Sequence, residues 1–264
     1  MNYKLVAIDL DDTLLRTDLT ISERTKQAIK ASMAQGTLVT FATGRMYRAA
    51  LPYALDLGLD LPLITYQGAL VKYVDGREVY HRPVAKDIAK EIINLVKPTG
   101  IHINVYYDDQ LYMEEATDWG KKYANTVRVP INLLPLPEGI KEDLTKILLI
   151  GDSEKLDEIQ TVLAERFQDN INLTKSQSCF LEISHPQATK GNALKGLVES
   201  LDLHPEQVIA IGDNLNDLDM LEYAGCGVAI GNAVEEVKRI ADMVTKNNDD
   251  DGVAEVIEKL ILGQ

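Results

Sequence analysis

The stretch of sequence that decides the fold is LVAIDLDDTL, residues 5–14. It opens with a continuous apolar run without polar alternation, which is typical of a strand covered on both faces in a parallel sheet. Asp9 and Asp11 stand where this run ends. Because open α/β sheets bind ligands at the carboxyl ends of their strands, the stretch predicts both a buried strand and a site beside it.

Three later runs repeat this pattern, at residues 38–42, 61–65 and 208–211. Segments with helical periodicity lie between the runs. One of them spans residues 20–35, and Thr20 with Glu23 is predicted to form a capping box at its start. Strands that alternate with helices require right-handed crossovers. The sequence therefore predicts an α/β fold with a doubly wound, mostly parallel, Rossmann-like core sheet.

Two parts of the chain depart from this alternation of strands and helices. Residues 71–80 are predicted to form a β-hairpin with a two-residue Asp75-Gly76 turn. After residue 83, adjacent strands and helices indicate a separate antiparallel α+β unit. We therefore expect an inserted cap domain at residues 83–186 and a core formed by the flanking pieces, residues 1–82 and 187–264.

The charge balance limits the classes of partner. The chain of 264 residues has 27 Lys and Arg against 41 Asp and Glu, a formal net charge of -14. Nucleic acid is not an expected partner, because phosphate backbones bind basic surfaces. No apolar run approaches the ~20 residues that a membrane helix needs, and the N-terminal run is too short for a secretion signal. We expect a cytoplasmic protein with neither a membrane nor a nucleic-acid partner.

Side chains suited to a metal or a phosphate follow the first two runs. The paired carboxylates Asp9 and Asp11 indicate a hard divalent cation such as Mg²⁺, although an acidic turn after a strand is the alternative. Thr43 and Gly44 follow the second run. A hydroxyl and free backbone N–H groups at the start of a helix suit an anion, and a turn without a ligand is again the alternative.

The remaining candidate residues lie in the last third of the chain. Lys190 is predicted at the start of a helix, where a cation is disfavoured unless an anion faces it. A solvated surface lysine is the alternative. The last run ends in GDNLND, residues 212–217, which adds the oxygen-bearing side chains of Asp213, Asn216 and Asp217. This segment does not fit a calcium loop, because Leu215 stands where an oxygen ligand is needed.

Taken together, these segments resemble the motifs of the haloacid dehalogenase-like phosphatase superfamily, and the resemblance covers the whole chain. Residues 9–14 are similar to the first motif, Thr43 to the second, Lys190 to the third and residues 212–217 to the fourth. The insertion lies between the second and third motifs, as in the Cof-type subfamily, where it forms an α/β cap over the site. One difference is Gln67, where an Asn is more usual.

The resemblance implies a phosphatase that depends on Mg²⁺ and forms an aspartyl-phosphate. Asp9 is the implied nucleophile, and Asp11 is the implied general acid and base. The implied metal ligands are Asp9, Asp213 and the backbone carbonyl of Asp11. The groups implied to bind phosphate are the Leu10 N–H, Thr43, the Gly44 N–H, Lys190 and Asn216, and Asp217 is implied to orient the metal or Lys190. The implied substrate is a small phosphorylated metabolite, such as a sugar phosphate or a nucleotide-like cofactor.

Two other functions stay open at this point. A phosphomutase can use the same aspartyl-phosphate intermediate, although comparable mutases carry a smaller helical cap earlier in the chain. A phospho-receiver module also combines a nucleophilic Asp, a Thr or Ser, a Lys and Mg²⁺, but it lacks a general acid placed like Asp11 and a large insertion. The sequence makes no prediction of the oligomeric state.

Some features of the insertion have two interpretations. The segment Ile150-Gly151-Asp152 imitates the fourth motif, and we interpret it as a strand end only. Five aromatic residues could line a substrate pocket or belong to the core of the insertion: Tyr106, Tyr107, Tyr112, Trp119 and Tyr123.

Overall fold

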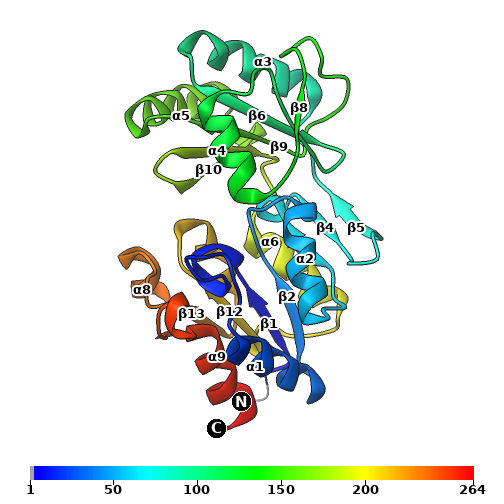
Figure 1. Ribbon diagram of the computed structural model, residues 1–264, viewed down its shortest axis with the longest axis vertical. Helices are drawn as coiled ribbons and strands as arrows, with labels where there is room; N and C mark the ends of the chain where they lie inside the picture. Colours follow the sequence, from blue (N-terminus) through cyan, green and yellow to red (C-terminus); the bar gives the residue numbers. More distant parts are fainter. Residues whose placement is uncertain (1–2) are drawn as a thin grey trace.

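A parallel sheet of five strands forms the centre of one half of the protein. In the computed structural model, which describes residues 3–264, its order is β14-β13-β12-β1-β2 (Figure 1). The strands are β1 (Leu5–Ile8), β2 (Leu38–Phe41), β12 (Val208–Gly212), β13 (Cys226–Ala229) and β14 (Met243–Val244). Ile8 pairs with both Phe41 and Ile211, so the carboxyl ends of three neighbouring strands are level. Residues that follow these strands therefore meet at one edge of the sheet.

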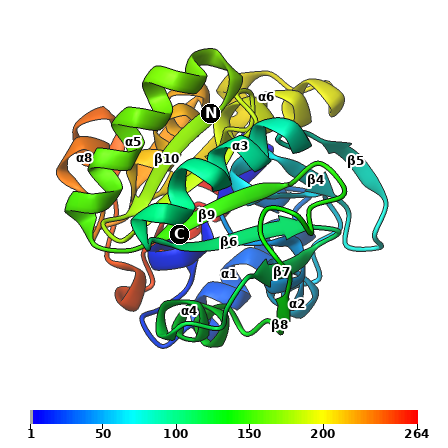
Figure 2. The ribbon, with the colours of Figure 1, turned by 90° about the horizontal axis from the view of Figure 1, so that it is seen from above.

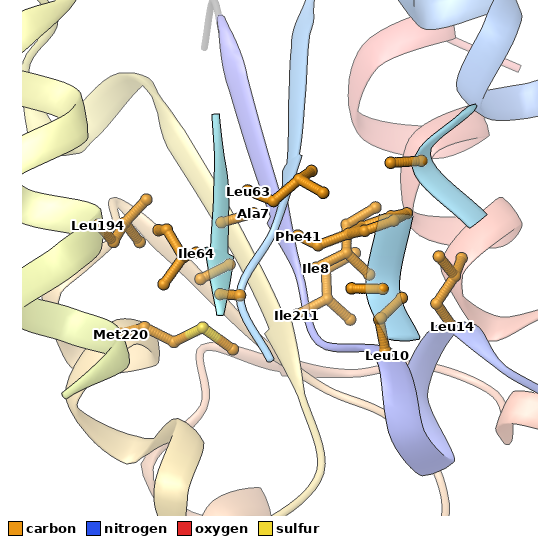
Figure 3. Packing of buried hydrophobic residues seen from close by; sticks show 14 of the residues in the cluster. Ala7, Ile8, Leu10, Leu14, Phe41, Leu63, Ile64, Leu194, Ile211 and Met220 are labelled. Atoms are coloured by element: carbon orange, nitrogen blue, oxygen red, sulfur yellow. The ribbon is translucent and has the colours of Figure 1, made fainter. Parts of the chain in front are cut away.

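Helices cover both faces of this sheet, which explains its continuous apolar runs. They are α1 (Glu23–Ala34), α2 (Tyr47–Leu57), α6 (Lys190–Ser200), α7 (Leu218–Tyr223), α8 (Glu235–Ile240) and α9 (Gly252–Ile257). Helix α1 packs against α9, and α6 against α7. Figure 3 shows the buried side chains of Ile8, Phe41 and Ile211 on one side of the strands and those of Leu194 and Met220 on the other.

A second sheet of six strands lies above the first (Figure 1), in the order β10-β11-β9-β6-β7-β8. Its strands are β6 (His102–Tyr107), β7 (Gln110–Met113), β8 (Ile131–Leu133), β9 (Lys146–Ile150), β10 (Asn172–Gln177) and β11 (Phe180–Ser184). All pairs are antiparallel except β7 with β8. The helices of this half are α3 (Lys86–Val96), α4 (Asp118–Val127) and α5 (Ser153–Phe167), and α3 and α5 lie across its outer face (Figure 2).

The two halves confirm the predicted fold class, an α/β core with an inserted α+β cap. The chain leaves the core between β5 and α3 and returns between β11 and α6. One face of the cap sheet belongs to the same buried cluster as the core, through residues such as Tyr106, Leu148 and Ile150. Among residues 3–264, no helix combines the length and the apolar character that crossing a membrane requires.

The predicted hairpin is present, but its turn differs from the prediction. It joins β4 (Leu70–Lys72) to β5 (Glu78–His81) in a small antiparallel sheet with β3 (Leu63–Thr65). The Gly76 N–H donates to the Tyr73 carbonyl at 3.0 Å, so Val74 and Asp75 are the central residues of the turn. Gly76 follows them with φ +91°, a left-handed conformation that glycine adopts without strain. The predicted two-residue Asp75-Gly76 turn is therefore wrong.

The start of α1 also differs from the prediction. The helix begins at Glu23, and the side chain of Ser22 accepts a hydrogen bond from the Thr25 N–H at 3.0 Å. The Thr20 hydroxyl instead donates to Asp18 at 2.6 Å. The capping box predicted at Thr20 is wrong, because Ser22 takes the capping position and a separate turn uses Thr20.

Candidate active site

Two aspartates meet at the carboxyl ends of β1 and β12. Asp9 follows β1 and Asp213 follows β12, and both side chains are buried. The Asp9 N–H donates to the Ile211 carbonyl at 3.0 Å, which continues the pairing of the two strands up to the site. Carboxylate oxygens of Asp9, Asp213 and Asp217 all lie within 4.8 Å of one another. The structure thus brings together the first and fourth predicted segments.

A wide turn after β1 returns the chain to the same place. It spans residues 10–14, and its Leu15 N–H bonds back to the Leu10 carbonyl at 2.8 Å. Asp12 adopts φ 56° within it. The turn carries Thr13 to Asp213, where its hydroxyl donates to Oδ1 at 2.9 Å. A short segment of chain therefore positions both the Asp9 carboxylate and a hydrogen bond to Asp213.

Lys190 supplies the positive charge of the cluster. It opens α6, whose capping residue is Thr189. Its Nζ lies 2.6 Å from Asp9 Oδ1 and 2.6 Å from Asp217 Oδ1. Burial alone would lower the pKa of Lys190, but the carboxylates of Asp217 and Asp9 outweigh it and raise that pKa. The anions that a lysine at a helix N-terminus requires are therefore these two carboxylates.

Asp217 is held by hydrogen bonds on both oxygens. Oδ1 binds Lys190, while Oδ2 accepts the backbone N–H groups of Asp213 at 2.9 Å and Asn214 at 3.1 Å. A Cβ on Gly212 would lie 2.5 Å from the Asp217 carboxyl carbon, so this approach requires glycine. Among residues 3–264, one carboxylate oxygen of Asp9 and one of Asp213 have no such partner. This arrangement suits Asp217 to an orienting role and the other two to metal binding.

The charges of the cluster fit a divalent cation. Burial and the neighbouring Asp217 carboxylate raise the pKa of Asp213 to about 7. Burial also raises the pKa of Asp9 well above its ordinary value, against the opposing effect of Lys190. When all three carboxylates are ionised, the one ammonium, which contacts Asp9 and Asp217, leaves two negative charges of the cluster without a counter-charge. Oxygen ligands with this charge are the donor set that Mg²⁺ prefers.

The residues after β2 form a second wall of the site. Thr43 is fully buried, and its Oγ1 accepts the Arg45 N–H at 3.1 Å. Gly44 lies against Gln67, since a Cβ there would stand 2.5 Å from Gln67 Nε2. Asn216 donates to Gln67 Oε1 at 3.1 Å. Gln67 therefore stands between two of the predicted phosphate-binding residues, although it departs from the family pattern.

Asp11 has a partner that the sequence analysis did not identify. Its carboxylate accepts two parallel hydrogen bonds from Arg45, Nε to Oδ2 at 2.8 Å and Nη2 to Oδ1 at 2.6 Å. Arg45 is buried, whereas the side chain of Asp11 is 43% exposed. The only sequence signal for Arg45 is its place directly after Thr43 and Gly44.

The cap places a buried ion pair above the core residues. Lys146 Nζ lies 2.7 Å from Glu182 Oε2 and donates to the Gly44 carbonyl at 2.9 Å. Gln67 Nε2 donates to Glu182 Oε1 at 3.3 Å. Neither cap residue was predicted from the sequence, where the available signal is a charged side chain within an apolar strand.

Core and cap together line a cavity of about 230 Å³, which is open to solvent on one side. Five residues of the predicted site line it from the core: Asp9, Asp11, Gly44, Asp213 and Asn216. Thr43, Lys190, Asp217 and Leu10 are buried behind this lining. Of the five aromatic candidates, Trp119 and Tyr123 line the cavity. Tyr107 and Tyr112 stack on each other instead, with ring centroids 4.3 Å apart, and Tyr106 is buried.

The chain belongs to the haloacid dehalogenase-like hydrolases. A model of this family matches residues 6–257, nearly the whole length. This finding confirms the family predicted from the four motifs.

Individual relatives agree with this assignment. The curated 5-amino-6-(5-phospho-D-ribitylamino)uracil phosphatase YitU of Bacillus subtilis is 31% identical over 261 residues, 97% of this chain and 96% of the relative. A solved haloacid dehalogenase-like hydrolase from Bacteroides thetaiotaomicron has a TM-score of 0.90 at 31% identity, over 98% of this chain and 100% of that one. TM0651 from Thermotoga maritima has a TM-score of 0.85 at 38% identity, over 97% of each chain. The predicted enzyme class, a phosphatase, is confirmed.

Proposed function

We propose that the protein is a Mg²⁺-dependent phosphatase that hydrolyses a small phosphorylated metabolite through an aspartyl-phosphate on Asp9. The observation that carries the proposal is the buried contact of Asp9 with Lys190, beside Asp213. Residues 1–82 and 187–264 form the proposed catalytic core, and residues 83–186 form the proposed cap.

The proposed roles follow from the contacts of each group. Asp9 attacks phosphorus because it lines the cavity and has one carboxylate oxygen without a hydrogen-bond partner among residues 3–264. The metal ligands are Asp9, Asp213 and the Asp11 carbonyl. Bound there, Mg²⁺ would reduce the repulsion between the carboxylate and a phosphate dianion. The phosphate oxygens bind the Leu10 N–H, Thr43, the Gly44 N–H, Lys190 and Asn216.

Asp11 is the proposed proton carrier. It gives a proton to the leaving alcohol oxygen as the bond from phosphorus to that oxygen breaks. In the second step it takes a proton from the water that hydrolyses the aspartyl-phosphate, which frees phosphate and Asp9. Because Arg45 holds both oxygens of the Asp11 carboxylate in this structure, the leaving group must displace Arg45 from at least one of them.

The covered cavity supports a small substrate. A cap above Asp9 shields the site from part of the solvent, whereas a phospho-receiver module has no use for such a cavity. YitU is named for a substrate that joins a phosphorylated ribityl chain to a uracil ring. A molecule of that size belongs to the proposed class of phosphorylated metabolites.

Replacement of Asp9 tests the proposal. With Mg²⁺ present, the unaltered protein should release phosphate from acetyl phosphate, and Asp9→Asn should reduce the release to the rate without enzyme. Labelled phosphate should become covalently attached to the unaltered protein only. Asp152→Asn is the matched control, because Asp152 follows a similar Ile-Gly strand end in the cap and is exposed. Turnover by Asp9→Asn, or no turnover by the unaltered protein, would contradict the proposal.

A further inference from the structure

The cavity above Asp9 has two ends of different chemistry. The end formed by the core carries carboxylates, amides and backbone groups, which suit a metal and a phosphate. The end formed by the cap combines a set of apolar side chains with polar ones, which are Lys122, Thr126, Lys146, Ser176, Gln177 and Glu182. Its apolar lining consists of Trp119, Tyr123, Val127, Leu148, Ile150 and Phe180. What occupies the cap end of the cavity must therefore bury an apolar surface.

The cap builds this apolar wall from regular elements. Along β9 the side chains alternate, so that Leu148 and Ile150 face the cavity while Leu149 belongs to the cluster under α3 and α5. Helix α4 adds Trp119 and Tyr123, which are one turn apart and therefore lie on one face. These residues stand on strands and a helix, so the wall exists before any ligand binds.

Two aromatic rings of the wall are already in contact. Tyr123 and Phe180 form an edge-to-face pair with centroids 5.7 Å apart and an interplanar angle of 84°. Trp119 lies one turn before Tyr123 on α4 and is 41% exposed. An exposed indole beside an aromatic pair is a surface on which a flat ring can stack. A sugar would leave hydroxyl groups without partners against these apolar side chains, which costs binding energy.

The buried charges near the wall neutralise each other. Lys146 is paired with Glu182, and Arg45 is paired with Asp11. Among the described residues that line the cavity, Lys122 is the cation without an ion pair, and it is exposed. A second phosphate or a carboxylate at this end of the substrate would therefore meet a solvated lysine and no unpaired buried cation. Lys146 and Glu182 do offer a donor and an acceptor side by side, which suits the polar edge of an uncharged heterocycle.

We infer that the substrate of this enzyme is a phosphate ester whose leaving alcohol carries an uncharged, planar heteroaromatic ring. The ring stacks in the pocket of Trp119, Tyr123 and Phe180, with its polar edge toward Lys146 and Glu182. This inference rests on the proposed function, because that function places the phosphate at Asp9. It narrows the substrate class to ring-bearing esters and excludes simple sugar phosphates.

Matched pairs of esters test the inference on the unaltered protein. Uridine 5′-monophosphate differs from ribose 5-phosphate by its ring, and flavin mononucleotide differs from ribitol 5-phosphate in the same way. With Mg²⁺ present, kcat/KM for the ester with the ring should exceed that of its partner at least tenfold in one pair or both, as expected for stacking on aromatic side chains. A ratio below ten in both pairs would overturn the inference.

Variants of the apolar wall test whether the ring of the substrate binds there. Trp119→Ala and Phe180→Ala should each reduce the larger of the two ratios at least threefold. Leu133→Ala is the control, because Leu133 lies on β8 of the same cap, is 65% exposed and does not line the cavity. The same reduction in Leu133→Ala, or none in either wall variant, would overturn the assignment of the ring to this wall.

A binding measurement separates failure of the inference from failure of the proposed function. Trp119 is the only tryptophan of the chain, so its fluorescence reports the wall directly. Riboflavin should quench this emission in a saturable way, after correction with free N-acetyltryptophanamide, and ribitol should not. Quenching without hydrolysis of acetyl phosphate would contradict the proposed function but not the inference. Hydrolysis of acetyl phosphate with neither quenching nor a tenfold ratio of kcat/KM in either pair of esters would contradict the inference but not the proposed function.

Discussion

At the scale of single residues, one buried ammonium holds the centre of the site together. Lys190 is 1% exposed and contacts the carboxylates of Asp9 and Asp217, which are 5% and 0% exposed. A buried ion pair contributes little net stability, because both charges lose their water. Removal of one partner is costly, since the other charge then stays buried without compensation.

Replacement of Lys190 should therefore destabilise the fold as well as the site. In protein treated with a chelator at neutral pH, Lys190→Met should lower the free energy of unfolding by about 3–5 kcal/mol. Urea denaturation measures this change. The control is Lys195→Met on the same helix, where an exposed lysine should change the stability by less than about 0.5 kcal/mol. Equal stability of the two variants would show that Lys190 is not a structural counter-charge.

The meeting of Asp9, Lys190 and Asp213 could be predicted from the sequence, and the pairing of Asp11 with Arg45 could not. Each of the first three stands at the end of an apolar run or at the start of a helix, where α/β folds collect their ligands. The Arg45 side chain reaches Asp11 across 34 residues of chain, because β1 and β2 are neighbours in the sheet. No local pattern around Arg45 carries that information.

At the scale of elements, long apolar runs were easy to predict and short interrupted ones were not. The runs that became β1, β2 and β12 are recognisable because both faces of each strand are buried. Strand β13 was missed, since Gly225 and Gly227 flank its first residue, Cys226, and interrupt the pattern. Glycine is required at position 227, because a Cβ there would lie 2.6 Å from the Leu221 carbonyl oxygen. Close approach of two elements is a tertiary property and leaves only a weak local signal.

The junction of β6 with α4 makes the stability of the cap depend on pH. His102 bonds through Nε2 to Asn104 Oδ1 at 2.8 Å and through Nδ1 to the Thr117 hydroxyl at 2.8 Å, and Thr117 caps α4. Burial lowers the pKa of His102 below its ordinary value of 6.5. Below about pH 6.5 the unfolded chain therefore binds a proton that the folded His102 does not.

The free energy of unfolding should consequently fall as the pH drops from about 6.5 toward the lowered pKa of His102. His102→Gln removes this titration, so its stability should decline less steeply, by up to about 1.4 kcal/mol per pH unit. At pH 7.5 the variant should be less stable by about 1–2 kcal/mol because of weakened hydrogen bonds. Urea denaturation between pH 7.5 and 5.5 measures both effects. If the free energy of unfolding falls equally steeply in both proteins, this pH dependence does not come from His102.

At the scale of the whole molecule, a small set of polar contacts joins the cap to the core in this closed arrangement. They include the bonds of Asp109 to Tyr66 and Arg48, of Lys146 to Gly44, of Glu182 to Gln67, and of Ser176 to Asn214. Further bonds join Gln110 to Arg48, Thr145 to His81, and Asn172 to Ala188. Lys146, Glu182 and Ser176 line the cavity, whereas Asp109 does not. Asp109, which binds two core residues, is therefore a contact through which the position of the cap can be altered without a change in the cavity lining.

Asp109 stands in the two-residue turn between β6 and β7. Its carboxylate accepts the Tyr66 hydroxyl at 2.8 Å and the Arg48 N–H at 3.0 Å, both from the core. Asp109→Ala removes these bonds to a charged acceptor, each of which contributes about 1.5–3 kcal/mol. The open state should become at least tenfold more populated relative to the closed state. We expect a larger radius of gyration by X-ray scattering and a kcat/KM about tenfold lower.

The neighbouring residue provides the control for this change. Asp108 is exposed and has φ 48°, close to the φ 50° of Asp109, so alanine introduces the same backbone strain at either position. Asp108→Ala should therefore keep the radius of gyration and kcat/KM of the unaltered protein, although it weakens the turn equally. If the two variants scatter and turn over alike, the strain of the turn, and not the carboxylate of Asp109, determines how the cap closes.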